Sequence, residues 1–430
     1  MSMVVKNNMS AVSTLNTLNK NSSALSKSLA KVSSGMKING AADDASGYAI
    51  SERMRVQIRG LDQANSNTQN GSSMMKVAEG AVSSTVDILK TLKEKVINAA
   101  NDSNTDEDRA TIQKELDQSI DQINDNANVT YNGKYLVDGS KNSKVTATTT
   151  SMTNQNLNTS TSFDSTFNTL TDRNGNSLNI QSTDTITLSY VKEGKTHTVT
   201  VSGGSSFNDI IKQASTDLAA GGASIAIGKD AAGDTVYTAS GKSALTITAT
   251  GTGVENQISG ITFSVSDTKG QIKKSANALL DGFTETIRAQ DTSKDNAITL
   301  QVGTKSNQAI KVGLTDMRAE ALGLQAKDGT TINIGTKENA NAAINVLDSA
   351  VQKALDQQTT IGSVQSRLEY TSSNLTTASE NVQSSESTIR DANMAKEMTE
   401  YTKNNVLMQA AQSMLAQANR SSSSVLSLLQ

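Results

Sequence analysis

The feature that most constrains this chain is a sustained 3-4-3-4 spacing of apolar and small residues near both ends, in 430 residues without a proline. A 3-4 repeat puts such residues on one narrow stripe of an α-helix, and the stripe is stable only against a partner. We therefore predict two terminal helices that pack on each other or on other copies of the chain. The spaced positions are Ala11, Leu15, Leu18, Ser22, Leu25, Leu29, Val32 and Met36 near the start, and Leu407, Ala411, Met414, Ala418, Ser421, Val425 and Leu428 near the end.

Composition agrees with long, uninterrupted helices. Average usage would give about 20 prolines in a chain of this length, and proline breaks helices. Hydrophobic residues make up 35% of the chain and aromatic residues 3%, which is low for one compact body of this size. We therefore expect an elongated molecule with thin cores.

Several kinds of site are opposed by what the chain lacks. There is no cysteine, hence no disulfide, thiolate metal site or catalytic thiol. A net charge of −3 gives no nucleic-acid footprint, and no apolar run approaches the ~20 residues of a membrane span. The N-terminus lacks a secretory signal, because its apolar run at 3–5 is short. We expect no cofactor, no metal, no nucleic acid and no membrane partner.

Helical periodicity fills both ends of the chain. A break is expected at 34–40, where glycines stand at helix-ending positions, with Asp43 or Asp44 as the next N-cap. The following helix contains Gly60, Gly71 and Gly80, which we expect to allow close approach of another helix. The expected helices cover about 2–33, 45–100, 105–128, 339–391 and 392–430.

The middle of the chain has strand character. From about residue 140 to 296 threonine, serine and glycine dominate. Apolar and polar residues alternate over 185–191 and 196–201, with Glu193-Gly194 between them, which predicts a β-hairpin. A short helix is expected near 207–214, and further strands near 224–227, 236–239, 245–248 and 261–265. The predicted fold class is α+β: a long antiparallel helical bundle or coiled coil formed by both chain ends, with a β-rich α/β insert in the middle.

Motifs at both ends resemble bacterial flagellins. The strongest, over residues 29–51, reads LAKVSSGMKINGAADDASGYAIS, and residues 59–71 continue it as RGLDQANSNTQNG. At the far end the similar segments are IGSVQSRL over 361–368, AAQSMLAQAN over 410–419 and VLSLLQ over 425–430. The resemblance covers roughly residues 1–139 and 297–430.

The resemblance implies a structural subunit of the flagellar filament used for swimming, whose terminal helices order on polymerisation. It implies a homo-oligomer of many copies outside the cell, export without a cleavable signal peptide, and contacts with cap and hook-associated proteins and a C-terminal export chaperone. The implied domains are 1–44 (inner-core helix and linker), 45–139 and 297–391 (outer core), 140–296 (surface insert of one or two subdomains) and 392–430 (C-terminal inner-core helix).

Two sets of packing residues follow from the stripes and the resemblance. The inner-core set is Leu15, Leu18, Leu25, Leu29, Val32, Leu407, Met414, Leu415, Val425 and Leu428. The outer-core set is Ile58, Leu61, Val82, Leu89, Ile112, Leu116, Ile361, Leu368, Leu375 and Val382.

A third set concerns host recognition. Flagellins sensed by a Toll-like receptor present an Arg, a Leu and a Glu on the outer-core helices, and these positions correspond here to Thr91, Lys95 and Glu115. Loss of the guanidinium and the apolar anchor predicts weak signalling, although a one-residue shift would bring Lys90 or Lys93 nearby.

Other functions are less well supported by the residues. A hook–filament junction protein shares such terminal helices, but the closing Leu428-Leu429-Gln430 favours flagellin. An enzyme hidden in the insert lacks a nucleophile–base pair, a metal cluster or a cofactor loop. His197 is the single histidine, and a zinc protease motif needs two. A helical signalling receptor is opposed by the missing membrane span.

Overall fold

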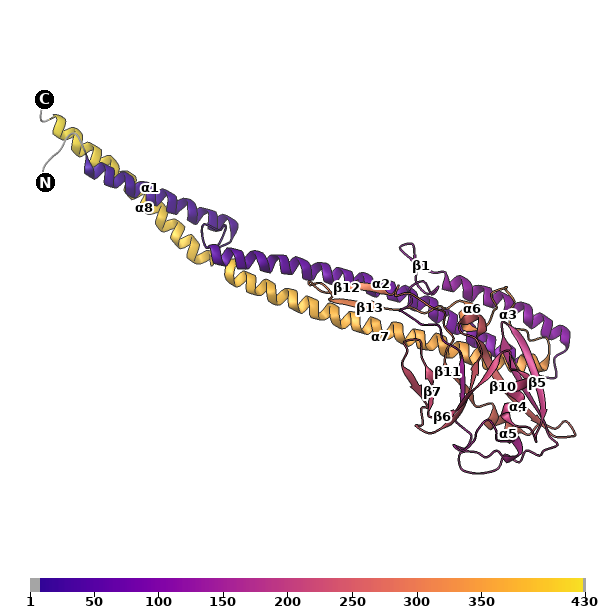
Figure 1. Ribbon diagram of the computed structural model, residues 1–430. Coiled ribbons are helices and arrows are strands. Elements are labelled where there is room, and N and C mark those ends of the chain that lie inside the picture. Colours follow the sequence, from indigo (N-terminus) through magenta and orange to yellow (C-terminus); the bar gives the residue numbers. More distant parts are fainter. Residues whose placement is uncertain (1–7, 428–430) are drawn as a thin grey trace. The chain divides into compact units, whose positions relative to one another are not determined.

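The structure is a computed structural model that describes the backbone of residues 8–427 and the side chains of residues 8–420. The chain divides into two compact units. The first unit, here unit 1, comprises Met1–Thr68, Gln301–Gln308 and Tyr370–Gln430, and unit 2 comprises Gln69–Leu300 and Ala309–Glu369. The helical ends and the β-rich middle confirm the predicted α+β class (Figure 1).

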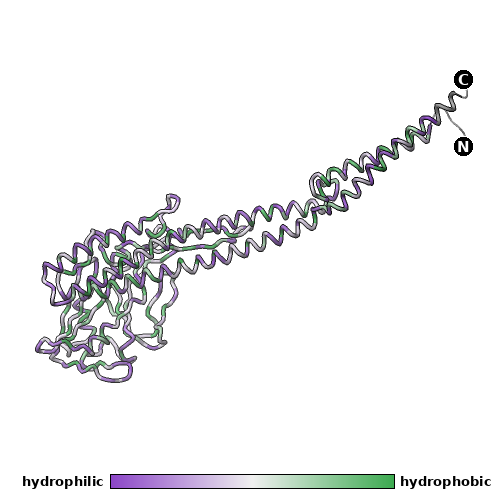
Figure 2. The backbone as a smooth tube through the Cα atoms, turned by 180° about the vertical axis from the view of Figure 1, so that it is seen from behind, coloured by the Kyte–Doolittle hydropathy of each residue, from purple (hydrophilic) through white to green (hydrophobic). Residues whose placement is uncertain are grey.

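Unit 1 contains the two terminal helices, α1 (Met9–Ser34) and α8 (Met394–Ser427). They run antiparallel and side by side, as Figure 1 and Figure 2 both show. The α1 helix begins after Asn8, whose side chain accepts from the N–H of Ala11, and ends at Gly35, where φ is +71°. Only glycine adopts that left-handed conformation without steric cost, so the predicted break at this glycine is confirmed.

The same unit holds parts of the two longest helices, α2 (Ala45–Ala99) and α7 (Lys337–Arg390). Asp44 begins α2, because its Oδ1 accepts from the N–H groups of Ser46 and Gly47. A small apolar cluster joins the helices through Leu61, Ala64 and Leu375. Polar pairs flank this cluster, including Arg55 with Glu386 and Asp62 with Ser379.

Two glycines of α2 leave room for the side chains of a β-hairpin. Strands β12 (Ile298–Gln301) and β13 (Ala309–Val312) form it. A Cβ on Gly60 would lie 2.9 Å from Thr304, and one on Gly71 would lie 2.6 Å from Leu300. A Cβ on Gly80 would meet nothing within 4 Å. The expectation that these glycines seat another helix is therefore wrong, since two receive hairpin side chains and the third faces open space.

In unit 2 a helical core forms between α2, α3 (Asp106–Ala127) and the start of α7. Regularly spaced apolar side chains of all three helices are fully buried here. They are Met75, Val82, Leu89 and Val96 on α2, Leu116, Ile120 and Ile123 on α3, and Val346, Leu347 and Ile361 on α7, each at most 1% exposed. A one-turn helix, α6 (Ala319–Leu322), contributes Leu322 to the buried residues.

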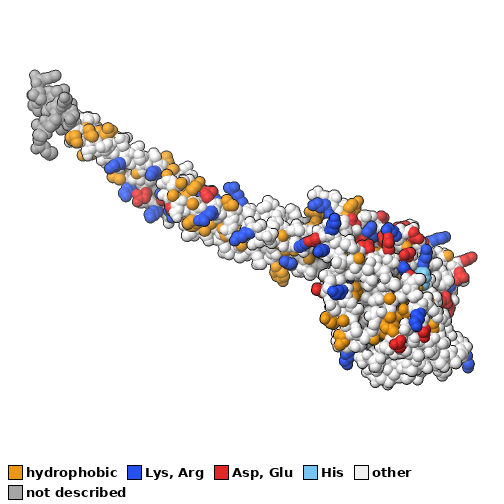
Figure 3. Space-filling view, viewed as in Figure 1, with side chains coloured by type: hydrophobic (Ala, Val, Ile, Leu, Met, Phe, Trp, Pro, Cys, Tyr) orange, Lys and Arg blue, Asp and Glu red, His pale blue; other side chains and the backbone are white. Residues whose placement is uncertain are grey.

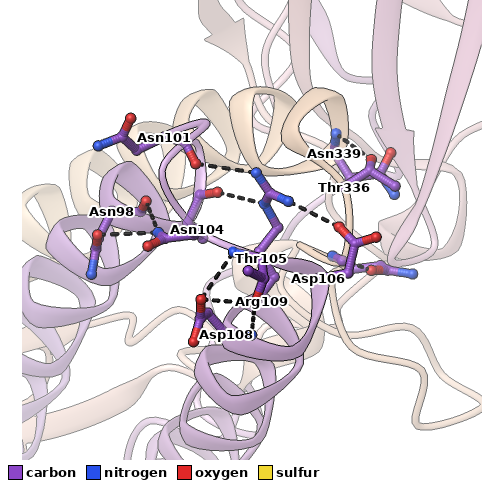
Figure 4. A network of polar contacts seen from close by, with 12 residues as sticks. Asn98, Asn101, Asn104, Thr105, Asp106, Asp108, Arg109, Thr336 and Asn339 are labelled. Atoms are coloured by element: carbon purple, nitrogen blue, oxygen red, sulfur yellow. Dashed lines mark hydrogen bonds and ion pairs between the residues drawn. The ribbon is translucent and has the colours of Figure 1, made fainter.

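The turn between α2 and α3 is closed by Arg109 (Figure 4). This arginine is 7% exposed. It donates to the carbonyls of Ala99 and Asn101 and pairs with Asp106 at 3.0 Å. A cation on the last carbonyls of a helix satisfies acceptors that have no partner within the helix. A capping box between Thr105 and Asp108 starts α3.

The rest of unit 2 is the β-rich insert. A three-stranded sheet has the order β10-β4-β5 and a four-stranded sheet the order β11-β3-β9-β6, with all pairs antiparallel. Two-stranded pairs join β1 to β2 and β7 to β8. The bounds are β1 (Thr130–Tyr131), β2 (Lys134–Tyr135), β3 (Ser151–Asn154), β4 (Thr185–Lys192), β5 (Lys195–Ser202), β6 (Leu218–Ser224), β7 (Ala226–Lys229), β8 (Thr235–Tyr237), β9 (Ala244–Ala249), β10 (Ile258–Ser266) and β11 (Phe283–Ile287).

The predicted hairpin is confirmed as β4–β5, and both turn residues, Glu193 and Gly194, have positive φ. The predicted helix near 207–214 is α4 (Phe207–Gln213), and a second one, α5 (Lys274–Leu280), was not anticipated. Phe167, Phe207 and Phe263 form the centre of the insert core, with ring centroids 4.5–6.3 Å apart. All five phenylalanines of the chain lie in this core, where the strands need large apolar side chains.

Candidate functional site

The predicted stripe of α1 splits into two columns in the structure. Ala11, Leu18, Leu25 and Val32, spaced by seven residues, are half-buried on the side of α8. The alternate column, Leu15, Ser22 and Leu29, is exposed, with Leu15 at 45% and Leu29 at 52%. One half of the heptad pattern is therefore covered within the chain on the side of the partner helix, and the other half remains largely exposed in this subunit.

The stripe of α8 divides in the same way. Ala411 is buried and Ala418 half-buried, whereas Leu407 and Met414 are 42% and 62% exposed. We call Leu15, Ser22 and Leu29 together with Leu407 and Met414 the open columns. Further exposed apolar side chains on the same helices are Met9, Val12, Met394, Met398 and Val406. Figure 3 shows apolar side chains gathered along this helix pair.

Polar contacts fix the seam between α1 and α8. Asn8 Nδ2 donates to the carbonyl of Ala418 at 3.1 Å, and Asn21 Nδ2 to that of Leu407 at 3.2 Å. Asn404 Nδ2 donates to Ser28 Oγ at 2.9 Å. Polar residues in a coiled-coil seam set the register at a cost in stability. The hydropathy of the two helices is accordingly mixed along their length (Figure 2).

The seam buries little apolar surface. Among the described side chains of α1 and α8, only Ser28 and Ala411 fall in the buried class, each 7% exposed. Since the hydrophobic effect scales with the apolar area removed from water, this pair gains little stability inside one subunit. The sequence pattern located both helices but not the asparagines, because they interrupt the apolar repeat.

The structure places the predicted inner-core residues as follows. Leu18, Leu25, Val32 and Leu415 are half-buried, and Leu15, Leu29, Leu407 and Met414 are exposed. Val425 and Leu428 lie outside the residues whose side chains are described.

The predicted outer-core residues lie mostly inside. Ile58, Ile112 and Val382 are half-buried, and the buried members are Leu61, Val82, Leu89, Leu116, Ile361, Leu368 and Leu375. Unlike the open columns, these side chains find their partners within one subunit.

The receptor-facing positions occupy adjacent places on α2 and α3. Lys95 Nζ lies 3.0 Å from a carboxylate oxygen of Glu115, and both side chains are well exposed. Thr91 is exposed, and its hydroxyl donates to the carbonyl of Asp87. Lys93 pairs with Asp348 and Lys90 with Asp87. Lys90, Lys93 and Lys95 are therefore each engaged with a carboxylate of the same chain.

The pattern did not single out Arg390, a buried arginine at the end of α7. It is 6% exposed, and its Nη1 donates to Glu52 at 2.7 Å. This hydrogen bond lowers the pKa of the Glu52 carboxyl below its ordinary value. A cation at a helix C-terminus is a common sequence signal. The position of Arg390 could therefore have been predicted from the sequence, but its pairing with Glu52 could not.

Within residues 8–427 no helix combines the length and the apolar character needed to cross a bilayer. In the same part of the chain no three or more metal-ligating side chains gather at one place.

The chain thus has paired helical ends, with half of each apolar repeat left exposed, around a β-rich insert. Comparison with known proteins gives the family. The bacterial flagellin N-terminal helical region matches residues 5–142, and the bacterial flagellin C-terminal helical region matches residues 344–429. The flagellin of Clostridium tyrobutyricum is 36% identical over 421 residues, covering 97% of this chain and 99% of that protein. The flagellin of Bacillus subtilis (strain 168) is 30% identical over 447 residues, covering 99% and 100%.

The chain therefore belongs to the bacterial flagellin family. It is a structural subunit of the flagellar filament, a polymer of many copies, and not an enzyme. A hook-associated protein of Legionella pneumophila is 14% identical with a TM-score of 0.34, covering 78% of this chain and 97% of that one. So distant a likeness does not favour the junction-protein alternative.

Proposed function

We propose that the open columns are the contacts through which subunits join, and that α1 and α8 become ordered as these columns are covered. The observation that carries the proposal is the split of both heptad stripes, one column facing the partner helix and the other facing out. Exposed apolar rows of this kind mark interaction sites. Head-to-tail contacts that do not close give an open helical filament.

The thin seam of the pair supports the ordering step. Fixing a residue costs about 1–2 kcal/mol of backbone entropy, and the α1–α8 seam buries too little apolar surface to offset that cost over two helices. Burial of the open columns against neighbouring subunits would supply the missing stabilisation. Segments of this kind fold when they bind.

A paired substitution tests the contact role. Leu29→Ser with Met414→Ser should abolish polymerisation, observed by electron microscopy after seeding, while the circular dichroism and melting of the remaining fold stay unchanged. The matched control is Ser23→Ala with Ser413→Ala, which alters exposed serines of the same helices. Long filaments from the Leu29/Met414 variant would contradict the proposal. Deleting 1–33 or 392–430 should likewise leave a folded fragment that does not polymerise.

We further propose that the helices of 45–139 and 297–391 form the outer core and residues 140–296 the outer surface of the filament. The closed helical core suits the first role, and the exposed Ser/Thr-rich loops of the insert suit the second. Limited proteolysis of filaments should cut the insert before it cuts α2, α3 or α7. Cleavage within those helices first would contradict the assignment.

Before assembly, we propose, an export chaperone covers the apolar side chains of α8, and the subunit leaves the cell through the flagellar export apparatus without a cleaved signal. The exposed Met398, Val406, Leu407 and Met414 support this role, because an uncovered apolar row promotes aggregation. Mass spectrometry of secreted protein should find the N-terminal segment intact. A cleaved leader would contradict the proposal.

The surface at Thr91, Lys95 and Glu115 is proposed to signal weakly through the host Toll-like receptor. The Lys95–Glu115 ion pair occupies the carboxylate and leaves neither a guanidinium fork nor an apolar anchor. Reporter cells should respond more strongly to a Thr91→Arg, Lys95→Leu double variant than to the natural chain. Equal responses, or strong activation by the natural chain, would refute this reading.

A further inference from the structure

Unit 1 contains two chain crossings, the segments in which the chain passes from one helix to the next, and they are hydrogen-bonded to each other. The chain passes from α1 to α2 at 35–44 and from α7 to α8 at 391–393. The N–H of Lys37 donates to the carbonyl of Arg390 at 2.7 Å, and the N–H of Ala392 donates to that of Gly35 at 2.9 Å. Between these bonds Met36 and Asp391 form an antiparallel bridge. The crossings are therefore one small antiparallel element and not two independent linkers.

The side chain of Arg390 fastens this element to α2. Its Nη1 donates to Glu52 Oε1 at 2.7 Å, and its guanidinium lies 5.4 Å from the centre of the Tyr48 ring. Both partners stand in the first turns of α2. A planar guanidinium makes a directional hydrogen bond and a ring contact at once, which lysine does not.

Arg390 of α7 forms a clamp with Glu52 and Tyr48 of α2, and a second arginine, Arg55, adds another contact between these two helices. Arg55 lies 3.6 Å from Glu52 and donates through Nε to Glu386 at 3.1 Å. Ile38, in the first crossing, is 3% exposed, and a Cβ on Gly47 would lie 2.7 Å from its Cδ1. Apolar contact, backbone hydrogen bonds and charge thus act on the same few residues where four helix ends meet.

We infer that Arg390 is a positioning residue for assembly, which fixes the direction in which α1 and α8 present their open columns relative to the neighbouring ends of α2 and α7. The inference rests on the proposed contact role of those columns. It adds that a subunit with intact columns still needs this clamp to present them in one direction.

The chain offers a direct way to measure this direction. It has no cysteine, so Ser26→Cys on α1 and Gln57→Cys on α2, both at exposed positions, can carry two spin labels. Labelled subunits are diluted into an excess of unlabelled natural protein and polymerised, and the label-to-label distance distribution is recorded by pulsed electron paramagnetic resonance.

Arg390→Ala should raise the population outside the natural distance peak about tenfold, the factor expected for one lost charge-assisted hydrogen bond. Arg390→Lys should give an intermediate result, because charge remains but the planar contact is lost. The control, Arg53→Ala, removes an exposed arginine of α2, the helix that Arg390 contacts, and should leave the distribution unchanged. An unchanged distribution for Arg390→Ala would overturn the inference.

A milder variant covers the case in which Arg390→Ala subunits do not enter the filament. Glu52→Gln keeps the shape and an acceptor while removing the charge, and should shift the distribution in the same direction as Arg390→Lys. Natural distributions for both Glu52→Gln and Arg390→Lys would overturn the inference. The contact role of the columns is judged separately, by whether the Leu29/Met414 variant polymerises.

Discussion

The α1–α8 pair of unit 1 and the α2–α3–α7 core of unit 2 are both built from long helices with a regular apolar repeat. In the core, side chains such as Val82, Leu116 and Ile361 are at most 1% exposed. In the pair, asparagine and serine occupy much of the seam, and Leu29 and Met414 remain 52% and 62% exposed. The difference teaches that one apolar repeat can close a fold or leave it open for other subunits, depending on whether both of its columns find partners within the chain.

The largest expected effect contrasts the two regions directly. Leu116→Ala in α3 should lower the free energy of unfolding of the monomer by about 2–5 kcal/mol, because it leaves a cavity in a closed core. Leu18→Ala in α1 should change it by less than about 1 kcal/mol, because the side chain is only half-buried. Urea titration of both monomers measures this. Equal losses would remove the distinction between a closed and an open region.

A second test concerns the charges inside the closed region. The side chains of Lys353 on α7 and Glu285 on β11 are 6% and 5% exposed, with Nζ and Oε1 3.3 Å apart, and burial lowers the pKa of Lys353. Lys353→Met should cost about 3 kcal/mol, because it removes the nearer of the two cations beside a buried carboxylate and leaves only Arg288, 3.9 Å away. Adding Glu285→Leu should recover most of that loss. If the double variant has the same free energy of unfolding as the single one, the pair stabilises the fold by more than the neutralisation of each charge by the other.

The sequence predicted the closed and open regions unequally. Helix positions, the Gly35 break and the Glu193-Gly194 hairpin follow from local rules on periodicity, capping and turns. The split of the stripes does not, because a heptad pattern names the residues of a seam but not which column meets which partner. Pairings far apart in sequence, such as Arg390 with Glu52 or Gly71 with Leu300, were also beyond local rules.

A smaller effect separates two glycines of the same helix. Gly71→Ala should destabilise the monomer by about 1–3 kcal/mol, because the added Cβ would lie 2.6 Å from Leu300 of the hairpin and force it to move. Gly80→Ala is the control and should stabilise by up to about 1 kcal/mol, since its Cβ meets nothing and alanine favours the helix. Thermal melts of both variants decide this. If both variants were more stable than the natural chain, the hairpin could move away from the added Cβ without a cost in free energy.

The smallest effect is a pH dependence within the insert. Burial raises the pKa of Asp281 from 3.8 to about 6, although its carboxylate accepts from the N–H of Phe263 at 2.6 Å. The folded state then holds this proton more tightly than the unfolded state, so stability falls as pH rises from about 4 to about 6. Asp281→Asn should remove about 1–2 kcal/mol of that fall, a value reduced for solvent screening. If the difference in the free energy of unfolding between the natural chain and Asp281→Asn stayed constant over this pH window, the raised pKa of Asp281 would be contradicted.

The central claim, that α1 and α8 are incomplete in one subunit and completed by others, is tested most directly by hydrogen exchange of monomer and filament compared segment by segment. Amides of α1 and α8 should exchange nearly as fast as an unfolded chain in the monomer and become protected in the filament. Amides of α2, α3 and the start of α7 should be protected in both. Equal protection of α1 and α8 in the monomer and the filament would contradict the claim.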